Sequence, residues 1–207
     1  FAERIADRGQ LKRWMMCCAW LIVIFMLLRM IKYEAFPEGS VFARYTWYLY
    51  YLPMLFIPLC TFYATSYIDG EEKREFVKVK PVFGAITFLL CIGVLSNDFH
   101  QGVFCFQDGF LNWESDYTHG FGFFAVIAWT YFLYTFSIVI MFKKCKLPKV
   151  KKKWWITIIP FALGVTMQLL IAFGKMPKMN GLMVINFPEA VCFMIALFWE
   201  CCIRIGL

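Results

Sequence analysis

The densest group of polar side chains beside an apolar segment is the run Ser96-Asn97-Asp98-Phe99-His100-Gln101. On a continuing helix, Asn97, His100 and Gln101 fall at positions i, i+3 and i+4 and therefore share one face. Asp98 lies about 100° further round such a helix. His100 is the one side chain here that changes charge near physiological pH. Two interpretations remain open: a ligand-binding turn, or a helix-end cap that connects neighbouring segments.

Other polar side chains are predicted to reach the same side of the protein. Gln168 lies within an apolar segment, and Glu189 begins the next one directly after Pro188. Ionisable or polar side chains in membrane spans are candidates for function because burying them in lipid is costly. An acidic residue in the first turn of a helix is also favoured by the helix dipole, so Glu189 has a purely structural interpretation as well.

Aromatic residues accompany this polar group. The stretch 97–120 is the longest connection between apolar segments, is rich in Phe, Trp and Tyr, and contains no Lys or Arg. Its apolar runs on both sides of Asp108-Gly109 predict a β-hairpin that turns there and covers one end of the protein as a lid. The predicted ligand-binding set is Asn97, Asp98, His100, Gln101, Tyr50, Tyr51, Trp113, Tyr117, Trp129, Gln168 and Glu189. For the tyrosines, an interfacial aromatic belt is the structural alternative.

Composition indicates which elements must position these residues. Of the 207 residues, 61% are hydrophobic and 17% are charged, and the mean hydropathy is +0.64. Soluble domains carry roughly 25% charged residues, so an all-α polytopic membrane bundle is predicted, as a single domain over residues 1–207. Apolar runs long enough to cross the hydrocarbon core predict six spans, at about 14–30, 46–68, 81–96, 121–142, 154–173 and 184–204.

The positions of Lys and Arg predict the orientation of these spans. If the N-terminus is cytoplasmic, the inner segments hold 16 of the 21 Lys and Arg. The outer segments hold the other five, which are Arg29, Lys32, Arg44, Lys175 and Lys178. Because Lys and Arg concentrate in short cytoplasmic loops, both ends of this fragment are predicted to be cytoplasmic. The basic block 143–153 is expected to lie against anionic lipid headgroups and not to bind nucleic acid.

Several classes of protein are disfavoured by what the chain lacks. No CxxC pair or Cys/His ligand spacing occurs among the nine cysteines, so neither disulfides nor a metal site is predicted. No hydrolase motif or glycine-rich phosphate loop is present, and no enzyme activity or cofactor is expected for this chain. No Lys lies in the centre of a predicted span, which disfavours a retinal pigment. Paired carboxylates in the spans, expected of an ion-coupled carrier, are also missing.

Four segments together resemble the N-terminal seven-transmembrane sensor region of bacterial histidine kinases, in the form common among Firmicutes. They are Trp47-Tyr48-Leu49-Tyr50-Tyr51-Leu52-Pro53, the run 96–101, Tyr117-Thr118-His119-Gly120-Phe121-Gly122-Phe123, and Glu200-Cys201-Cys202-Ile203-Arg204-Ile205-Gly206-Leu207. The resemblance covers nearly the whole chain. It implies a further helix before residue 1, a cytoplasmic kinase domain after residue 207, and a homodimer.

These observations predict a receptor module of a two-component system in the bacterial plasma membrane. A small amphipathic ligand or a peptide, arriving from outside or dissolved in the membrane, would bind in an outward-facing pocket between the turn at 97–101 and the aromatic lid. The signal would pass to the kinase domain of the same chain, within surrounding membrane lipids. The alternatives left open are a small-molecule or peptide transporter, a structural membrane subunit and a membrane-embedded enzyme.

Overall fold

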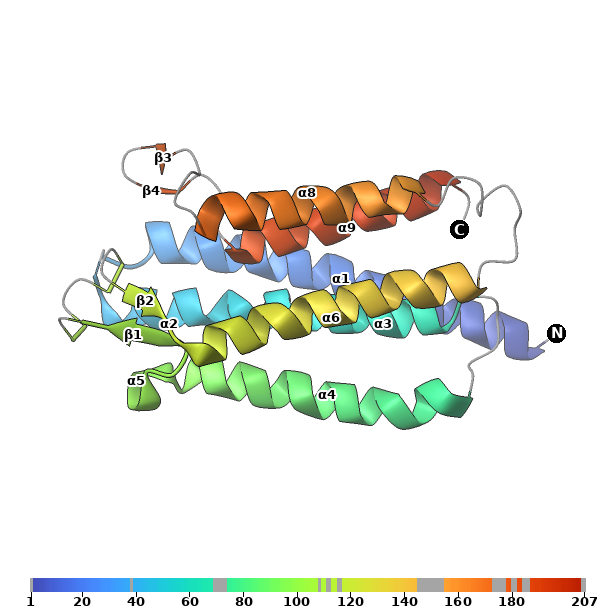
Figure 1. Cartoon of the computed structure of the whole chain (residues 1–207), viewed down its shortest axis with the longest axis horizontal. Helices are drawn as coiled ribbons and strands as arrows, with labels where there is room; N and C mark the ends of the chain where they lie inside the picture. The colour runs from blue at the N-terminus through green and yellow to red at the C-terminus, as the bar shows by residue number, and fades with distance from the viewer. Residues whose placement is uncertain are drawn as a thin grey trace.

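The computed structural model describes residues 2–37, 39–68, 74–107, 109–110, 113–114, 117–144, 155–172, 178–179, 182–183 and 187–205. Within these ranges the chain is mostly helical, and its long helices run lengthwise beside one another (Figure 1). They are α1 (Ala2–Glu34), α4 (Arg74–Leu95), α6 (Phe121–Lys144), α8 (Trp155–Ala172) and α9 (Phe187–Ile205). Shorter helices are α2 (Val41–Leu49), α3 (Tyr51–Ser66) and the single turn α5 (Asn97–His100).

The helices α2 and α3 replace the one span predicted from residue 46 to 68. Ser40 caps the start of α2, where its side-chain oxygen accepts a hydrogen bond from the N–H of Ala43 at 3.2 Å. Tyr50 keeps helical angles between the two helices, with φ −60° and ψ −29°. Pro53 has no N–H, so the carbonyl of Leu49 loses its partner four residues on. The chain therefore continues in a helical path with a break in its hydrogen bonds.

The helix α3 lies at the centre of the bundle and packs against α1, α4, α6 and α9. In the most apolar 18-residue stretch of Val41–Ser66, 78% of the residues are buried within the protein, against 11% in the corresponding stretch of Gly9–Glu34. Four described segments are long and apolar enough to cross a membrane, namely Gly9–Glu34, Val41–Ser66, Phe76–Leu95 and Phe121–Lys143, and Ile158–Met167 is a shorter apolar helix. The exposed faces of the outer helices are therefore apolar without being part of the core.

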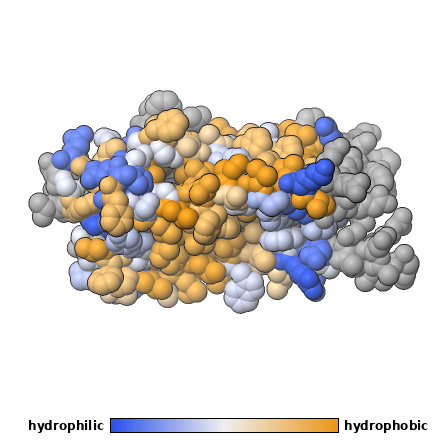
Figure 2. All heavy atoms as spheres, turned by 90° about the horizontal axis from the view of Figure 1, so that it is seen from below, coloured by the Kyte–Doolittle hydropathy of each residue, from blue (hydrophilic) through white to orange (hydrophobic). Residues whose placement is uncertain are grey.

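One flank of the bundle shows this apolar surface directly. Figure 2 displays a band of hydrophobic side chains with hydrophilic ones gathered toward both ends. Large apolar side chains exposed on the helices include Phe88 and Leu89 of α4 and Phe124 of α6. Exposing this apolar band to water would be unfavourable, whereas the hydrocarbon chains of a lipid bilayer accommodate it. The molecule is thus a helical membrane protein.

A small hairpin lies at the end of the bundle that also carries α5, called the hairpin end from here on (Figure 1). Strand β1 (Phe104–Phe106) pairs antiparallel with β2 (Tyr117–His119), and Phe104 faces His119 across the pair. A β-hairpin was predicted, but its turn was wrongly placed at Asp108-Gly109, because the strand that pairs with β1 begins only at Tyr117. The observed register continues through Gly120 N–H to the carbonyl of Val103 and Gly122 N–H to that of Gly102, both 2.9 Å. A turn at residue 108 would forfeit these bonds.

A second small pair of strands, β3 (Lys178–Met179) and β4 (Leu182–Met183), joins α8 to α9 at the same end (Figure 1). The start of α1 and the end of α9 lie together at the opposite end. The helices α8 and α9 pack closely against each other. A Cβ placed on Gly164 of α8 would collide with the side chain of Met194 of α9. The basic block 145–153 falls outside the described residues.

Candidate functional site

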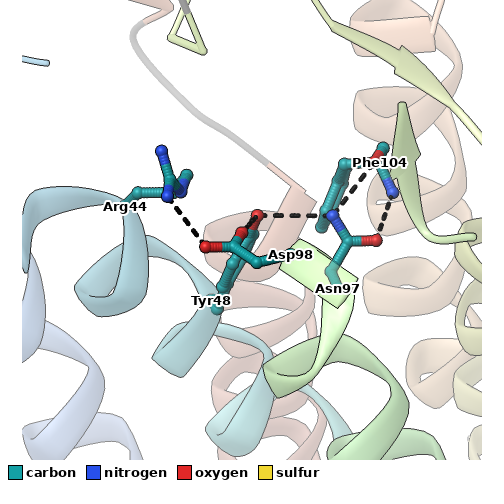
Figure 3. A network of polar contacts seen from close by, with 5 residues as sticks. All are labelled: Arg44, Tyr48, Asn97, Asp98 and Phe104. Atoms are coloured by element: carbon teal, nitrogen blue, oxygen red, sulfur yellow. Dashed lines mark hydrogen bonds and ion pairs between the residues drawn. The ribbon is translucent and has the colours of Figure 1, made fainter. Parts of the chain in front are cut away.

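The side chain of Asn97 joins α5 to the hairpin (Figure 3). Its oxygen accepts hydrogen bonds from the N–H groups of Val103 and Phe104, at 2.9 and 3.0 Å. Its nitrogen donates to the carbonyl of Phe104 at 2.9 Å and to the hydroxyl of Tyr48 at 3.3 Å. Asn97 is fully buried, and these four bonds use its amide to capacity. The amide of Asn97 therefore supplies hydrogen bonds that a neighbouring strand would otherwise give to the backbone at the edge of β1.

Asp98 connects the same turn to α2 (Figure 3). One carboxylate oxygen accepts from the guanidinium of Arg44 at 2.8 Å, and the other from the hydroxyl of Tyr48 at 2.7 Å. The guanidinium also lies over the ring of Phe110, 3.9 Å from its centre. Sequence reasoning missed Arg44, which it counted only as a charge outside the membrane. One signal could have found this ion pair, because Arg44 and Asp98 were both predicted to lie on the outer side of the membrane.

The predicted common face of Asn97, His100 and Gln101 forms only in part. The side chain of Gln101 bonds to β1, as Asn97 does, and accepts from the N–H of Phe106 at 3.2 Å, whereas His100 does not. The helix does not continue, because Gln101 adopts a left-handed conformation with φ 49° and ends α5. His100 is exposed, and its Nδ1 accepts from the N–H of Gly102 at 2.8 Å while Nε2 lies 3.0 Å from the carbonyl of Gly93. With Nδ1 accepting, Nε2 carries the proton and donates to Gly93. His100 therefore caps the end of α4, turned away from Asn97.

Aromatic rings fill the space beneath the hairpin, where the pocket was expected. Trp47 lies 4.5 Å from Phe104 and 5.2 Å from Tyr117, measured between ring centres. Tyr51 packs against Phe104 at 5.4 Å. Such contacts at ordinary aromatic distances leave the hairpin seated on the bundle as part of its core. Tyr51 and Tyr117 thus lie together, as predicted, but they pack against neighbouring rings.

A cavity lies on the flank of the bundle, between α4 and α6 at the hairpin end. It has a volume of about 310 Å³. Its walls are apolar apart from the ring of His100 and nearby backbone, and they comprise Leu89, Leu90, Gly93, His100, Gly102, Val103, Phe121, Gly122 and Val126. Of the predicted ligand-binding residues whose side chains the structure describes, only His100 lines it. We call this cavity the α4–α6 groove.

A second group of charges gathers where α1, α9 and the predicted lid (residues 97–120) meet. Arg29 forms an ion pair with Glu189, and Lys32 forms one with Glu114 at 3.1 Å. The Lys32 ammonium lies 5.2 Å from the ring centre of Trp113. Tyr50 lies within electrostatic range of Arg29 and Glu114. Three predicted residues, Tyr50, Trp113 and Glu189, therefore come together here. Sequence reasoning missed their partners Arg29, Lys32 and Glu114, because it treated them separately as loop charges.

The remaining predicted residues lie apart from both groups. Trp129 donates from its indole nitrogen to the hydroxyl of Thr87 at 2.9 Å and so connects α6 to α4. The side chain of Gln168 lies outside the described part of the structure, although its backbone belongs to α8. Neither residue extends the Asn97 network, so the predicted set divides among several places.

Two titratable side chains of β2 respond to partial burial. The ring of His119 lies 3.9 Å from that of Phe123, measured between centres. This burial disfavours the charged imidazolium and lowers the pKa of His119 from its ordinary value. Burial also raises the pKa of the Tyr117 phenol. Both shifts favour the neutral side chains, although His119 itself keeps exposed surface.

The apolar flank, the helical bundle and the polar turn define a polytopic membrane protein with an elaborated hairpin end. Comparison with protein families makes this specific. Residues 3–205 match the family model for the N-terminal 7TM region of histidine kinase, and the chain belongs to this family. No curated protein and no solved structure matches the chain significantly. The chain is thus the membrane sensor region of a histidine kinase, as its sequence motifs indicated.

Proposed function

We propose that this region senses an amphipathic molecule dissolved in the membrane and signals to a bacterial two-component kinase domain in the same chain. The observation that supports this ligand class is the α4–α6 groove, which is apolar and lies on the lipid-facing flank. Under the hairpin, where a water-soluble ligand would enter, aromatic rings occupy the space. A ligand arriving through the membrane reaches the groove without unpacking them.

The proposed orientation places the hairpin end outside the cell. It follows from the distribution of Lys and Arg, most of which lie in segments at or between the opposite ends of the helices. We propose six spans in this region, with α8 and α9 added to the four apolar segments described above. The groove then opens into the outer leaflet of the plasma membrane.

The lining of the groove suits a molecule with an apolar tail and a polar end. Leu89, Leu90 and Val126 provide apolar walls, while His100 and the backbone of Gly102 lie at the hairpin end. Phe99 and Phe121 are 88% and 87% exposed beside this end, as is typical of side chains at the edge of the hydrocarbon. A tail in the groove and a polar group near His100 would match both surfaces.

The helices α6, α3 and α9 form a continuous packed path from the groove toward the kinase. The helix α6 packs on α3, and α3 packs on α9. Near the far end of α9, the indole nitrogen of Trp199 donates to the hydroxyl of Thr61 at 3.3 Å. A ligand that separates α4 from α6 would favour one arrangement of this path over another, which is the requirement for signalling. A homodimer would bring two kinase domains together.

The test fills the groove without disturbing the core. A Cβ placed on Gly93 meets no atom within 4 Å, so Gly93→Leu occupies the groove with little strain. Kinase autophosphorylation by the full-length protein is measured in membrane vesicles and by a reporter in cells. We expect a shift in output of at least about fivefold, the lower end of ordinary coupling between sites.

The control adds bulk to the same helix outside the groove. Ile92 is 46% exposed and does not line the groove, so Ile92→Phe should leave output unchanged. A photoreactive amino acid at position 89 should capture lipid-like molecules in the wild type and fewer in Gly93→Leu. The proposed ligand class is refuted if Gly93→Leu has the same kinase output as Ile92→Phe and captures as much lipid-like material as the wild type.

A further inference from the structure

The charges between α1, α9 and the lid surround two buried polar groups that lack partners. The hydroxyl of Tyr50 and the indole nitrogen of Trp113 form no hydrogen bond with any described residue. Each side chain is 1% exposed. A buried donor without an acceptor costs roughly 1–3 kcal/mol, and the indole N–H can only donate. An acceptor is therefore what this position lacks.

Two cations lie beside these groups, Lys32 next to Trp113 and Arg29 within electrostatic range of Tyr50. The Lys32 ammonium lies between two rings, 4.7 Å from the centre of Tyr33 and 5.2 Å from that of Trp113. The Arg29 guanidinium lies 5.9 Å from the centre of the Tyr33 ring. Aromatic faces hold these cations in fixed positions. Arg29, Lys32, Tyr50 and Trp113 thus supply two positive charges and two unused hydrogen-bond donors from α1, the α2–α3 break and the lid.

Two glutamates already neutralise the cations, and they differ in burial. The Glu189 side chain is 9% exposed and comes from α9, whereas Glu114 is 28% exposed and comes from the lid. Glu114 can turn outward and take its charge back into water at small cost. Lys32, which is 8% exposed, cannot follow it. Leaving a buried ammonium unpaired is unfavourable, so another anion must replace the carboxylate.

We propose that this cluster is a binding site for an oxyanion, either the phosphate of a lipid headgroup or a free phosphate, and that Glu114 occupies it as an internal competitor. The anion would take the place of the Glu114 carboxylate against Lys32 and accept hydrogen bonds from Tyr50 and Trp113. Its binding releases the lid from α1. The site lies apart from the α4–α6 groove, and its binding assay does not depend on kinase signalling.

The experiment measures anion binding to the purified full-length protein in lipid nanodiscs. One arm uses phosphatidylcholine nanodiscs and titrates inorganic phosphate against chloride at equal ionic strength. The other arm raises the fraction of phosphatidylglycerol without added phosphate. Binding is followed as a concentration-dependent rise in the unfolding temperature. A response to phosphate assigns a soluble ligand, and a response to phosphatidylglycerol alone assigns a lipid headgroup.

Charge variants separate specific binding from general electrostatics. Removing the competitor with Glu114→Gln should tighten binding by about tenfold, the ratio expected for one charge-assisted hydrogen bond. Lys32→Met should abolish it. Glu34→Gln is the matched control, because Glu34 is an exposed carboxylate near the same end of α1. It should bind as the wild type does.

A milder variant guards against misfolding. Trp113→Phe keeps an aromatic ring against Lys32 but removes the indole N–H, and it should weaken binding about fivefold to tenfold while the protein stays folded. The proposal is overturned if Glu114→Gln and Glu34→Gln respond alike in both arms, or if Lys32→Met retains the full response. The same holds if no arm shows binding in Glu114→Gln.

Discussion

Two polar groups lie at the hairpin end of this protein, and they differ in how many of their buried polar atoms have hydrogen-bond partners. In the Asn97 group, the amide of Asn97 uses all four of its hydrogen bonds, and Tyr48 both donates and accepts. In the group around Lys32, the polar atoms of Tyr50 and Trp113 lack partners among the described residues. The amide of Asn97 is fully matched, although the Nε of Arg44 in the same network has no partner among the described residues. Matched polar atoms fix structure, whereas unmatched buried donors such as those of Tyr50 and Trp113 are where a ligand would gain binding energy.

The difference also concerns which elements are joined. The Asn97 group connects α2, α5 and β1, which lie close together in the chain. The Lys32 group connects α1 to the lid and to α9, the helix that leads toward the kinase. Under the proposal above, a change in the second group would reach α9, while the first group serves to seat the hairpin. The proposal therefore gives stability to one group and regulation to the other.

The largest expected effect tests the matched group. Asn97→Ala leaves the N–H groups of Val103 and Phe104 and the carbonyl of Phe104 buried without partners. At roughly 1–3 kcal/mol for each such group, a loss of about 3 kcal/mol or more in unfolding free energy is expected. Unfolding in detergent micelles measures it. Asn97→Asp, which keeps the two accepting contacts, should lose less; equal stability of Asn97→Ala and wild type would contradict the structural role.

The same substitution in each group gives a direct comparison. Tyr48→Phe removes the donor to Asp98, and a loss of about 1–2 kcal/mol in unfolding free energy is expected for a bond to a charged group. Tyr50→Phe removes a hydroxyl that has no partner among the described residues, so a change within about 0.5 kcal/mol is expected. Thermal unfolding of the two variants side by side measures the contrast. If Tyr50→Phe proves the more destabilising, the hydroxyl of Tyr50 has a structural partner.

The smallest effect concerns pH. Because burial lowers the pKa of His119 below its ordinary value of 6.5, the unfolded chain takes up a proton more readily than the folded one. The resulting stability is present above pH 6.5 and is lost as the pH falls through the folded pKa. His119→Gln should therefore lose less stability between pH 7.5 and pH 5 than the wild type. Identical pH profiles would show that His119 does not titrate on unfolding.

Several features followed from the sequence because they depend on local or summed properties. Apolar runs of sufficient length predicted the helices, and α6 and α8 begin and end within two residues of the predicted segments. The motif around Asn97 identified the family that the whole-chain comparison then showed. A hairpin was expected from the apolar runs that flank Asp108-Gly109, although its turn was misplaced. These inferences need no knowledge of which segments are neighbours.

The candidate site itself could be predicted only in part. Asn97 and Asp98 were recognised as important, but Asn97 bonds to β1 while His100 bonds back to α4. Helical spacing also cannot anticipate that α5 ends at the left-handed Gln101. The strand that pairs with Phe104 was misplaced because its register depends on bonds from Gly120 and Gly122 that extend the pairing toward α6. Glycine is required at position 120, where a Cβ would collide with the carbonyl of Gly102.

The sequence by itself determined that this protein is a helical membrane protein, because hydrophobic length and charge distribution act through the bilayer and not through particular contacts. Its motifs added the resemblance to histidine-kinase sensor regions, which the family comparison showed. Only the tertiary structure decided which polar residues meet. Arg29, Lys32 and Glu114 were unremarkable as separate charges, and they became a cluster once α1, the lid and α9 came together. Contacts between distant segments depend on the packing of whole helices, which no short stretch of sequence encodes.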